Sequence, residues 1–460
     1  MMRLSEAASA LGAELRGEDV TFTGVSTDSR TLRKGDLFIA LRGERFDGNA
    51  FVERARSGGA IAAMVDAAFA DAQDASFPTI TVDDTRRALG RLAAHWRSRF
   101  DVRLVGLTGS SGKTTVKEML AAILREAVGE TGGAAAVLAT RGNLNNDVGV
   151  PLMLLELTAA SQYAVIEMGM NHAGEIGYLA RLAEPDVALI TNAGRAHIEF
   201  FGTEEAIAAA KGEIFEGLSP EGTAVINGDD RFAPMWRERA AGHRCVEFAL
   251  EKPADVTATF SSRSLMSEVV LKTPAGIANA TLRAPGVHNV RNALAAAAAA
   301  VALNVGASAI AAGLDRYAGV KGRLQARQTA TGAIVIDDTY NANPESTRAA
   351  ILVLAQCKAP RLLVLGDMGE LGAQGPKLHA ELGTYAREAG IERLLTLGEQ
   401  SAETARVFGD GAKHCTGIED LIAEVGDALA PDLTVLVKGS RFMKMERVVH
   451  AFTAGEAQCF

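Results

Sequence analysis

Short apolar runs alternate with longer amphipathic stretches along most of the chain. Between residues 85 and 315, four such runs are each followed by a helical spacing of apolar positions, at 104–107, 164–167, 187–191 and 223–226. Short apolar runs bounded in this way predict buried strands. Strands alternating with helices predict a doubly wound α/β domain around a parallel sheet.

The same alternation returns after residue 315, and a shorter version precedes residue 85. Four more runs predict strands, at 334–337, 362–365, 394–397 and 435–437, and the last three end at glycine or at Lys438-Gly439. Strands that end in this way are typical of Rossmann-like sheets, which bind ligands outside the strands' carboxyl ends.

In the N-terminal block, strand patterns at 36–41 and 78–82 flank a helix pattern at 51–59, and residues 83–85 predict a cap for a helix at 86–97. The length calls for more than one domain. We therefore expect an α/β protein with three domains: a small α/β domain at 1–84, a central domain at 85–315 and a Rossmann-like domain at 316–460.

The composition limits the class of protein. Apolar residues make up 48% of the chain and charged residues 22%, as in globular domains, and the net charge of −9 offers no basic face for nucleic acid or an anionic membrane. The four cysteines lack C-x-x-C spacing, and neither an apolar leader nor a membrane-spanning run is present in the sequence. We expect a cytoplasmic monomer that binds small anionic molecules through local basic clusters.

The strongest chemical signal lies between the strand at 104–107 and the next helical pattern. The segment reads Gly109-Ser110-Ser111-Gly112-Lys113-Thr114-Thr115. The backbone N–H groups of such a turn and the dipole of the following helix attract phosphate, while the lysine and the first threonine suit terminal phosphates and Mg²⁺. Leu107 replaces the first glycine of the strict P-loop motif, so an ordinary glycine-rich turn is the alternative. The Lys-Thr-Thr sequence favours a nucleoside triphosphate site.

Two later strands end at residues that suit a metal ion. Glu167 ends the strand at 164–167, where it would complete the Mg²⁺ coordination that Thr114 begins; the alternative is a cap for the next helix. His197 follows the strand at 187–191 and is a candidate second ligand, although an isolated loop histidine is more often an ordinary surface residue.

Together these segments resemble the Mur ligase family, the ATP-dependent amide-bond synthetases of peptidoglycan precursor assembly. The resemblance covers the whole chain and rests on the glycine-rich turn, on Glu167-Met168-Gly169, and on the segments 142–146 and 288–293 before an alanine-rich helix. It implies the three-domain fold described above.

Other segments are most similar to the branch of the family that joins D-alanyl-D-alanine to UDP-N-acetylmuramoyl-tripeptide. They are 337–344, 366–372 and 438–441. The Asp-Asn-Pro-Arg signature of the diaminopimelate-adding branch is absent, and Asn341-Ala342-Asn343-Pro344 stands in its place. The N-terminal segments 26–30 and 43–48 are similar to a UDP-recognising block.

The resemblance implies a reaction in which ATP phosphorylates a carboxylate and an amine then attacks the acyl phosphate. It implies two magnesium ions, the first held by Thr114 and Glu167 beside Lys113, the second by His197 and a carbamylated Lys211. A lysine on a helix surface is the alternative for Lys211. An uncharged amine could trap carbon dioxide and so become a carboxylate-like ligand.

The resemblance also implies roles in nucleotide binding for Asn289, Asn292, Arg323 and Asp338. A helix N-cap is the alternative for Asn289, and a solvated hinge is the alternative for residues 321–327. The segment 315–321, which contains Gly319, is the predicted hinge for closure of the third domain.

Candidate substrate contacts are spread over all three blocks. Structural salt bridges are the alternative for the charged N-terminal members. The candidates are Ser29, Arg30, Arg45, Phe46, Asp47, Asn145, Asn146, Asn341, Asn343, Lys438 and Arg441.

Two rival functions stay open at this stage. One is a sister ligase of the same superfamily, either the diaminopimelate-adding type or a folylpolyglutamate-synthetase-like enzyme. The other is a nucleotide-binding regulatory protein without catalysis, which the occupied catalytic positions disfavour.

Overall fold

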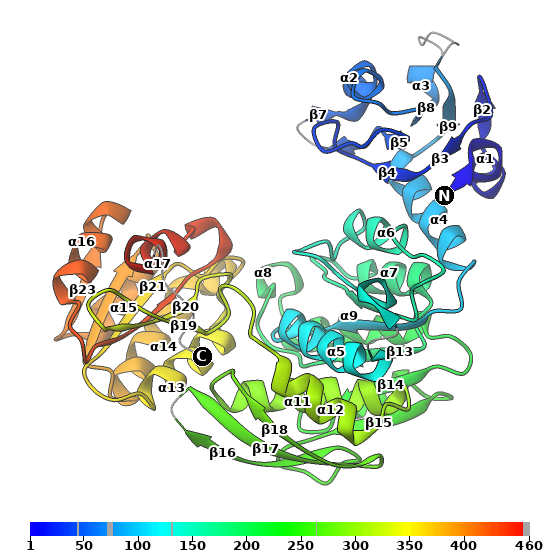
Figure 1. Ribbon diagram of the computed structural model, residues 1–460. Helices are drawn as coiled ribbons and strands as arrows, with labels where there is room; N and C mark the ends of the chain where they lie inside the picture. The colour runs from blue at the N-terminus through cyan, green and yellow to red at the C-terminus, as the bar shows by residue number, and fades with distance from the viewer. Residues whose placement is uncertain (44–45, 71–76, 130–131, 264, 454–460) are drawn as a thin grey trace.

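The computed structural model describes residues 1–43, 46–70, 77–129, 132–263 and 265–453. Three α/β units follow one another in chain order, each around its own sheet (Figure 1). The predicted three-domain α/β fold is therefore confirmed, while the boundaries after residues 84 and 315 stay predictions. No described helix is long and apolar enough to cross a membrane.

The N-terminal unit is built on a five-stranded sheet in the order β2-β9-β8-β5-β4, parallel except for β2. Apolar side chains of β5 and β8 fill its core. The strands are β2 (Glu14–Arg16), β4 (Gly24–Ser26), β5 (Asp36–Ile39), β8 (Ala62–Asp66) and β9 (Thr79–Val82), with helices α1 (Leu4–Leu11), α2 (Val52–Ser57) and α3 (Ala67–Ala70). Two short pairs are added: β1 (Met2–Arg3) with β3 (Thr21–Phe22), and β6 (Arg42–Gly43) with β7 (Phe46–Asp47).

Helix α4 (Thr85–Arg97) connects this unit to the central one. It begins one residue before the predicted start, after Asp84, whose side chain accepts hydrogen bonds from the N–H groups of Arg86 and Arg87 at 2.9 and 3.0 Å. At its other end, the Trp96 indole N–H donates to the carbonyl of Leu157 at 3.0 Å. The Trp96 hydrogen bond fixes the C-terminal end of α4 against the central unit.

The central unit contains a six-stranded parallel sheet in the order β11-β12-β10-β13-β14-β15. The predicted strands are present, and their apolar residues are buried on both faces, as expected for a parallel sheet. The strands are β10 (Arg103–Thr108), β11 (Val137–Ala139), β12 (Tyr163–Glu167), β13 (Val187–Ile190), β14 (Thr223–Asn227) and β15 (Arg244–Phe248). The helices are α5 (Lys113–Val128), α6 (Gly149–Leu154), α7 (Glu175–Ala183), α8 (Ile198–Phe201), α9 (Glu204–Gly212) and α10 (Ala233–Arg239).

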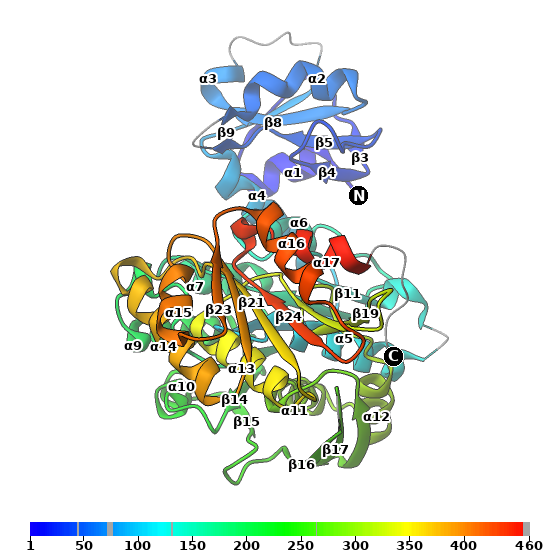
Figure 2. The same cartoon turned by 90° about the vertical axis from the view of Figure 1, so that its left-hand side faces the viewer.

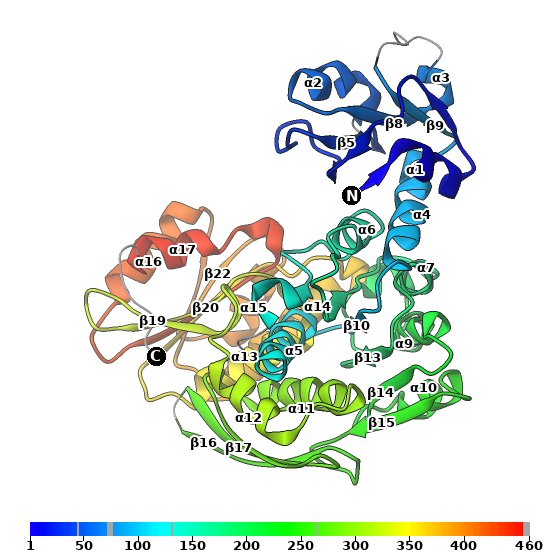
Figure 3. The same cartoon turned by 45° about the vertical axis from the view of Figure 1, so that its right-hand side comes forward.

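A three-stranded antiparallel sheet in this unit was not predicted. It comprises β16 (Thr257–Arg263), β17 (Met266–Thr273) and β18 (Gly276–Leu282). The alanine-rich helix α11 (Val287–Ala302) lies between this sheet and α5, beside α12 (Ala307–Arg316) (Figure 3). Its alanines are almost completely buried, as is typical of a helix that is apolar on all sides.

The C-terminal unit has a six-stranded sheet in the order β19-β20-β24-β21-β22-β23, parallel except for the edge strand β19 (Figure 2). Its strands are β19 (Gln325–Gln328), β20 (Ile334–Asp338), β21 (Arg361–Gly366), β22 (Arg393–Leu397), β23 (Ala412–Cys415) and β24 (Thr434–Lys438). Its helices are α13 (Pro344–Ala355), α14 (Gly375–Glu388), α15 (Ser401–Phe408), α16 (Ile418–Ala428) and α17 (Glu446–Thr453). The carboxyl ends of β20 and β24 lead to residues that line the cavity described next.

Candidate active site

The glycine-rich turn between β10 and α5 adopts a backbone that only glycine tolerates at two positions. Gly109 and Gly112 have φ values of 156° and 82°. A Cβ atom on Gly109 would lie 1.8 Å from Thr191 Oγ1, and one on Gly112 would lie 2.3 Å from Asn292 Oδ1. The turn therefore brings its backbone close to neighbouring polar residues, and the first turn of α5 presents N–H groups that have no partner within the helix.

Neighbouring strand ends anchor this turn. The N–H of Ser110 donates to the carbonyl of Asn192 at 3.0 Å, and the N–H of Ser111 donates to the Asn192 side chain at 3.0 Å. The Ser110 hydroxyl also contacts the backbone of Gly194. The turn is thus held rigidly before any ligand binds.

Thr114 and Glu167 meet at the carboxyl ends of adjacent strands. The Thr114 hydroxyl donates to Glu167 Oε2 at 2.9 Å, and the amide of Asn145 donates to the other carboxylate oxygen at 2.9 Å. Glu167 is 3% exposed. Helix α7 begins after Gly174, so Glu167 is not its cap and that alternative is wrong.

Lys113 is buried in the same place. Its Nζ donates to the carbonyl of Gly109 at 2.7 Å. Burial lowers the pKa of Lys113, with a further lowering by Arg323, while Glu167 and Glu370 oppose this shift. Lys113 therefore lies where it can contact phosphate oxygens, and its buried surroundings favour the binding of an anionic group beside it.

Arg323 reaches from the start of the C-terminal unit into this cluster. Its Nη2 donates to Thr114 Oγ1 at 2.9 Å, and its guanidinium lies over the Tyr340 ring, 4.3 Å from the centroid. The alternative of a solvated hinge at this arginine is therefore wrong.

Asp338 and Lys438 form a buried ion pair. Lys438 Nζ donates to Asp338 Oδ2 at 2.6 Å and to the carbonyl of Asn341 at 2.8 Å, and the backbone N–H of Leu324 donates to Asp338 Oδ1 at 3.2 Å. Burial raises the pKa of Asp338, while Lys438 opposes that shift. This pair holds the segment around Arg323 against the ends of β20 and β24.

His197 contacts the C-terminal unit, whereas Lys211 is buried on α9 of the central unit. His197 Nδ1 lies 2.6 Å from Glu370 Oε2 of the C-terminal unit. Lys211 is 2% exposed on α9, so the surface-lysine alternative is wrong. Burial, with the neighbouring Lys113 charge, holds the pKa of Lys211 well below its usual range. Among the described residues, none forms a hydrogen bond or ion pair with the Lys211 amine.

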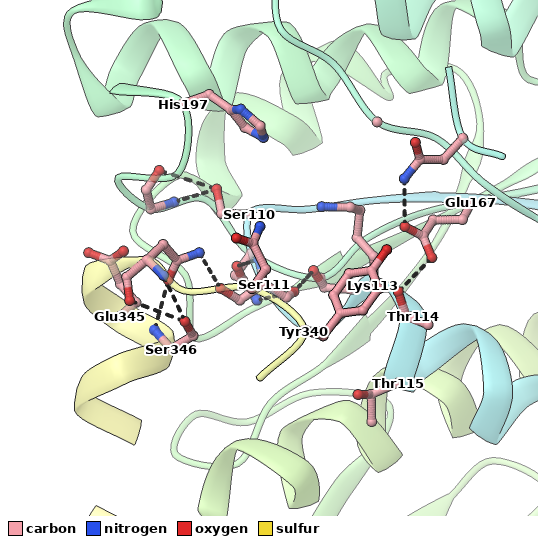
Figure 4. Close-up of a pocket in the computed structure, with 18 of the residues that line it drawn as sticks. Ser110, Ser111, Lys113, Thr114, Thr115, Glu167, His197, Tyr340, Glu345 and Ser346 are labelled. Atoms are coloured by element: carbon pink, nitrogen blue, oxygen red, sulfur yellow. Dashed lines mark hydrogen bonds between the residues drawn. The ribbon is translucent and has the colours of Figure 1, made fainter. Parts of the chain in front are cut away.

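A cavity of about 940 Å³ unites most of the predicted residues. Figure 4 shows Lys113, Thr114 and Glu167 on one side and Glu345 and Ser346 of α13 on the other. The predicted residues that line it are Ser110, Ser111, Gly112, Lys113, Thr114, Thr115, Asn145, Asn146, Glu167, His197, Asn289, Asn292, Arg323, Asp338, Asn341, Asn343 and Lys438.

Several of the lining amides also shape the local backbone. The Asn292 amide donates to Asn289 Oδ1 at 3.0 Å, and Asn289 donates to the carbonyl of Pro285 at 2.8 Å; Gly286 caps α11, so the N-cap alternative for Asn289 is wrong. Asn146 Oδ1 accepts from the N–H of Gly149 at 2.8 Å. Asn343 caps α13 and donates to Ser111 Oγ at 3.2 Å across the two units.

The N-terminal candidates lie in another unit. Arg30 pairs with Asp28 at 2.7 Å on the surface, and Asp47 accepts from the N–H of Asn49 at 2.9 Å. Phe46 is 56% exposed on β7. Ser29 lies in the loop of Arg30, whereas Arg45 falls outside the described residues. Arg441 pairs with Glu446 at 2.8 Å beside the C-terminal unit's sheet.

Sequence reasoning missed the ion pairs that join the central and C-terminal units. Arg195 Nε lies 2.7 Å from Glu345 Oε1, and its Nη1 lies 3.6 Å from Glu381 Oε2. Glu370 was missed as well. These residues share only one feature in the sequence: each is a charged residue that follows a strand or lies in a helix. That feature identifies no partner until the two units are placed together.

The residues at Thr114 fit a magnesium ion. No group of three or more His, Cys, Asp or Glu among the described side chains is arranged to hold a metal alone. Magnesium in nucleotide sites typically takes one or two protein oxygens and completes its shell with phosphates and water. The 2.9 Å between Thr114 Oγ1 and Glu167 Oε2 matches the edge of an octahedron with bonds of about 2.1 Å.

Fold and site together define a three-domain protein with a P-loop nucleotide site closed by its third domain. Residues 21–97 match the Mur ligase catalytic domain, 107–300 the Mur ligase middle domain, and 322–441 the Mur ligase glutamate ligase domain. The chain belongs to the Mur ligase family.

Individual relatives extend this relationship over the full length. The chain is 44% identical over 452 residues to the UDP-N-acetylmuramoyl-tripeptide--D-alanyl-D-alanine ligase of Escherichia coli, covering 97% of each. The crystal structure of MurF from Acinetobacter baumannii superposes with a TM-score of 0.90 at 37% identity, covering 98% of each chain. MurF ligase from Thermotoga maritima, solved in complex with ADP, gives a TM-score of 0.83 at 27% identity over 95% of this chain and 98% of that one.

Proposed function

We propose that the protein is the ATP-dependent ligase that joins D-alanyl-D-alanine to UDP-N-acetylmuramoyl-tripeptide. The observation that carries the proposal is the single cavity in which the P-loop, the Thr114–Glu167 pair and residues of the C-terminal domain meet. The chain is similar to ligases of this name over nearly its full length, which agrees with the proposal. The product would be the UDP-linked pentapeptide, with ADP and phosphate.

The chemistry follows from the poor leaving group of a carboxylate. Its oxygen attacks the γ-phosphorus of ATP, the bond to the β-phosphate oxygen breaks, and ADP leaves. The dipeptide amine then attacks the acyl phosphate carbon, loses a proton, and expels phosphate as the amide forms. Both steps gather negative charge, so Lys113, Arg323 and the N–H groups of α5 stabilise oxygens that the reactants cannot neutralise themselves.

Closure of the third domain would exclude water from the acyl phosphate intermediate. Arg323, Asn343 and Glu345 come from the C-terminal domain and already contact the P-loop side of the cavity. A water-excluding site prevents hydrolysis of the acyl phosphate before the amine arrives. Residues 315–321, with Gly319 at a φ of 84°, are the proposed hinge.

Magnesium ions would be held by Thr114 and Glu167 at one site and by His197 at a second. When bound, they neutralise charge on the transferred phosphoryl group. The protein's part is to orient these ligands, which the hydrogen bond from Asn145 to Glu167 does for the first site.

Carbamylation of Lys211 would supply the second site with a carboxylate. Its uncharged amine adds to the carbon of carbon dioxide and loses one proton, giving a carbamate. Lys117 is a natural control, since it is equally buried but its ammonium pairs with Glu118 at 2.8 Å and donates to the carbonyl of Thr140. With ¹³C-bicarbonate, a carbamate resonance is expected in the wild type and in Lys117→Met, and its presence in Lys211→Met would refute the assignment.

The UDP moiety would bind the N-terminal domain, with Ser29, Arg30, Arg45, Phe46 and Asp47 as candidates. Asn341, Lys438 and Arg441 are candidates for the peptide end, and Lys438 would act there through Asp338 and Asn341 because it is buried. A cytoplasmic, monomeric enzyme is part of the proposal.

Phosphate release from ATP, with each substrate omitted in turn, tests the proposed function. We expect release to require the UDP-tripeptide and D-alanyl-D-alanine together, with the UDP-pentapeptide detected by mass. Release with diaminopimelate or single amino acids, but not with the dipeptide, would assign the protein to a sister ligase instead.

A further inference from the structure

Glu370 and His197 face each other across the boundary between the central and C-terminal domains. His197 follows β13, and Glu370 follows β21, so the two side chains belong to different sheets. His197 Nδ1 lies 2.6 Å from Glu370 Oε2, and the two side chains are 23% and 48% exposed. Nothing in the reaction described above gives Glu370 a part.

The backbone on both sides of this contact is unusual. His197 and Glu370 are non-glycine residues with left-handed φ values of 65° and 60°. The N–H of Glu199 donates to the carbonyl of Glu370 at 3.3 Å, and a Cβ on Gly372 would lie 3.3 Å from Glu199 Cγ. Strained residues of this kind persist only where the surroundings hold them, and they cluster at functional sites.

The geometry suits control of the imidazole. The Nδ1–Oε2 contact is short, and Nδ1 is buried without a hydrogen-bond partner among the described residues, so Glu370 is the carboxylate placed to hold a proton on it. A proton on Nδ1 that is held by a carboxylate leaves Nε2 unprotonated and turned away from Glu370. A histidine in that tautomer is a metal ligand, and carboxylates commonly orient metal-binding histidines in this way.

We propose that Glu370 is a positioning residue that orients His197 for the second metal ion when the C-terminal domain closes. The inference rests on the proposed function, in which His197 is a ligand of that ion. Because Glu370 is supplied by the closing domain, an open molecule would have an unoriented His197 and a weak second site. Phosphoryl transfer would then be coupled to closure, so that the acyl phosphate forms only where water is excluded.

Histidine tautomers and metal affinity test the proposal directly. ¹⁵N NMR of histidine-labelled protein, with the His197 signal assigned by its loss in His197→Ala, reports which ring nitrogen carries the proton. Mn²⁺ binding, followed by electron paramagnetic resonance in the presence of a non-hydrolysable ATP analogue, reports the second site. Glu403→Gln is the matched control, since Glu403 pairs with Arg406 at 2.8 Å within α15 of the same domain and takes no part in the contacts between domains described above.

We expect Glu370→Ala to convert His197 from the Nδ1–H form to a mixture and to weaken the second Mn²⁺ site about 10- to 100-fold. Glu370→Gln should keep part of the tautomer preference and of the Mn²⁺ affinity, since its amide oxygen still accepts a hydrogen bond, and Glu403→Gln should change neither. An unchanged tautomer and Mn²⁺ affinity in Glu370→Ala would overturn the inference, as would a defect confined to the KM for D-alanyl-D-alanine.

The metal role of His197 fails separately. If His197→Ala binds Mn²⁺ as the wild type does, the proposed ligand is wrong, whatever Glu370 does. If His197→Ala loses the second site while Glu370→Ala retains it, the ligand stands and the positioning role alone is refuted.

Discussion

Thr114 Oγ1 and Glu167 Oε2 lie 2.9 Å apart, although the residues are separated by 53 positions in the sequence. Thr114 lies in the first turn of α5, the helix after β10, and Glu167 ends β12, the strand paired with β10. Parallel pairing brings their ends to one edge of the sheet, so a hydroxyl and a carboxylate converge beside the phosphate-binding turn.

Replacing Glu167 by glutamine is expected to remove catalysis but not the fold. An amide of the same shape can keep hydrogen bonds with Thr114 and Asn145, whereas it loses the charge that would hold magnesium. We expect kcat to fall at least ~100-fold, by analogy with the loss of other electrostatic stabilisers. Steady-state kinetics at several Mg²⁺ concentrations measure this, with thermal unfolding as the control. Retention of full activity would exclude Glu167 from the metal site.

Alanine substitutions of the two glycines that flank α5 distinguish the effect of backbone strain from that of a steric clash. Gly112 and Gly129 both have positive φ, at 82° and 68°, but a Cβ on Gly129 meets no atom within 4 Å. Gly129 has φ 68° and ψ −172°, a conformation that essentially only glycine adopts, so Gly129→Ala should cost about 1–3 kcal/mol of stability and leave ATP binding intact. Gly112→Ala should also displace Asn292 and weaken ATP binding at least ~10-fold, as measured by calorimetric titration. Equal ATP affinities in the two variants would contradict this account of the turn.

The ion pairs of Arg195 are expected to stabilise the closed arrangement of domains. Arg195→Gln removes contacts to Glu345 and Glu381 that are only partly exposed, with an expected loss of about 1–2 kcal/mol of closure free energy. Small-angle scattering with ATP analogue and UDP-tripeptide should show a larger radius of gyration than the wild type.

Arg348→Gln is the control for that experiment. Arg348 pairs with Glu381 at 3.1 Å within the C-terminal domain, so its loss should not open the molecule. Identical scattering from Arg195→Gln and the wild type would show that other contacts hold the domains together.

His288 makes stability depend on pH below neutrality. Burial, with smaller contributions from Lys438 and Arg291, lowers its pKa to about 4. The unfolded chain, with an ordinary histidine pKa near 6.5, therefore binds more protons as the pH falls from about 6.5 to 4, and stability declines over that window. Between pH 7 and pH 5 this amounts to about 2 kcal/mol. Calorimetry should show a smaller loss in His288→Gln, and an equal loss in both proteins would refute the assignment.

The sequence predicted those parts of the structure that local chemistry determines. The phosphate-binding turn, the cap of α4 by Asp84 and Glu167 at the end of β12 each follow from a few neighbouring residues. The sheet β16–β18 was missed although Val269 and Leu271 alternate with exposed positions, the pattern of a strand with one buried face. These three strands follow one another without helices between them, so the βα alternation that predicted the other strands does not reveal them.

Contacts between domains could not be predicted in the same way. Arg195 and Glu345 are 150 positions apart, and Glu370 reaches His197 only because the third domain folds back over the second. Their pairing depends on the relative placement of two sheets, which no local pattern encodes. Lys211 illustrates the same point, because its burial on α9 distinguishes it from an ordinary helix-surface lysine.

Isotope transfer tests the central claim, that the protein activates a carboxylate as an acyl phosphate. UDP-N-acetylmuramoyl-tripeptide is labelled with ¹⁸O in the carboxylate that receives the γ-phosphoryl group. It is incubated with ATP, Mg²⁺ and D-alanyl-D-alanine, and the released phosphate is analysed by mass. The account predicts one ¹⁸O atom in each phosphate formed from a doubly labelled carboxylate, together with one retained in the new amide. Phosphate without ¹⁸O, alongside normal UDP-pentapeptide formation, would contradict it.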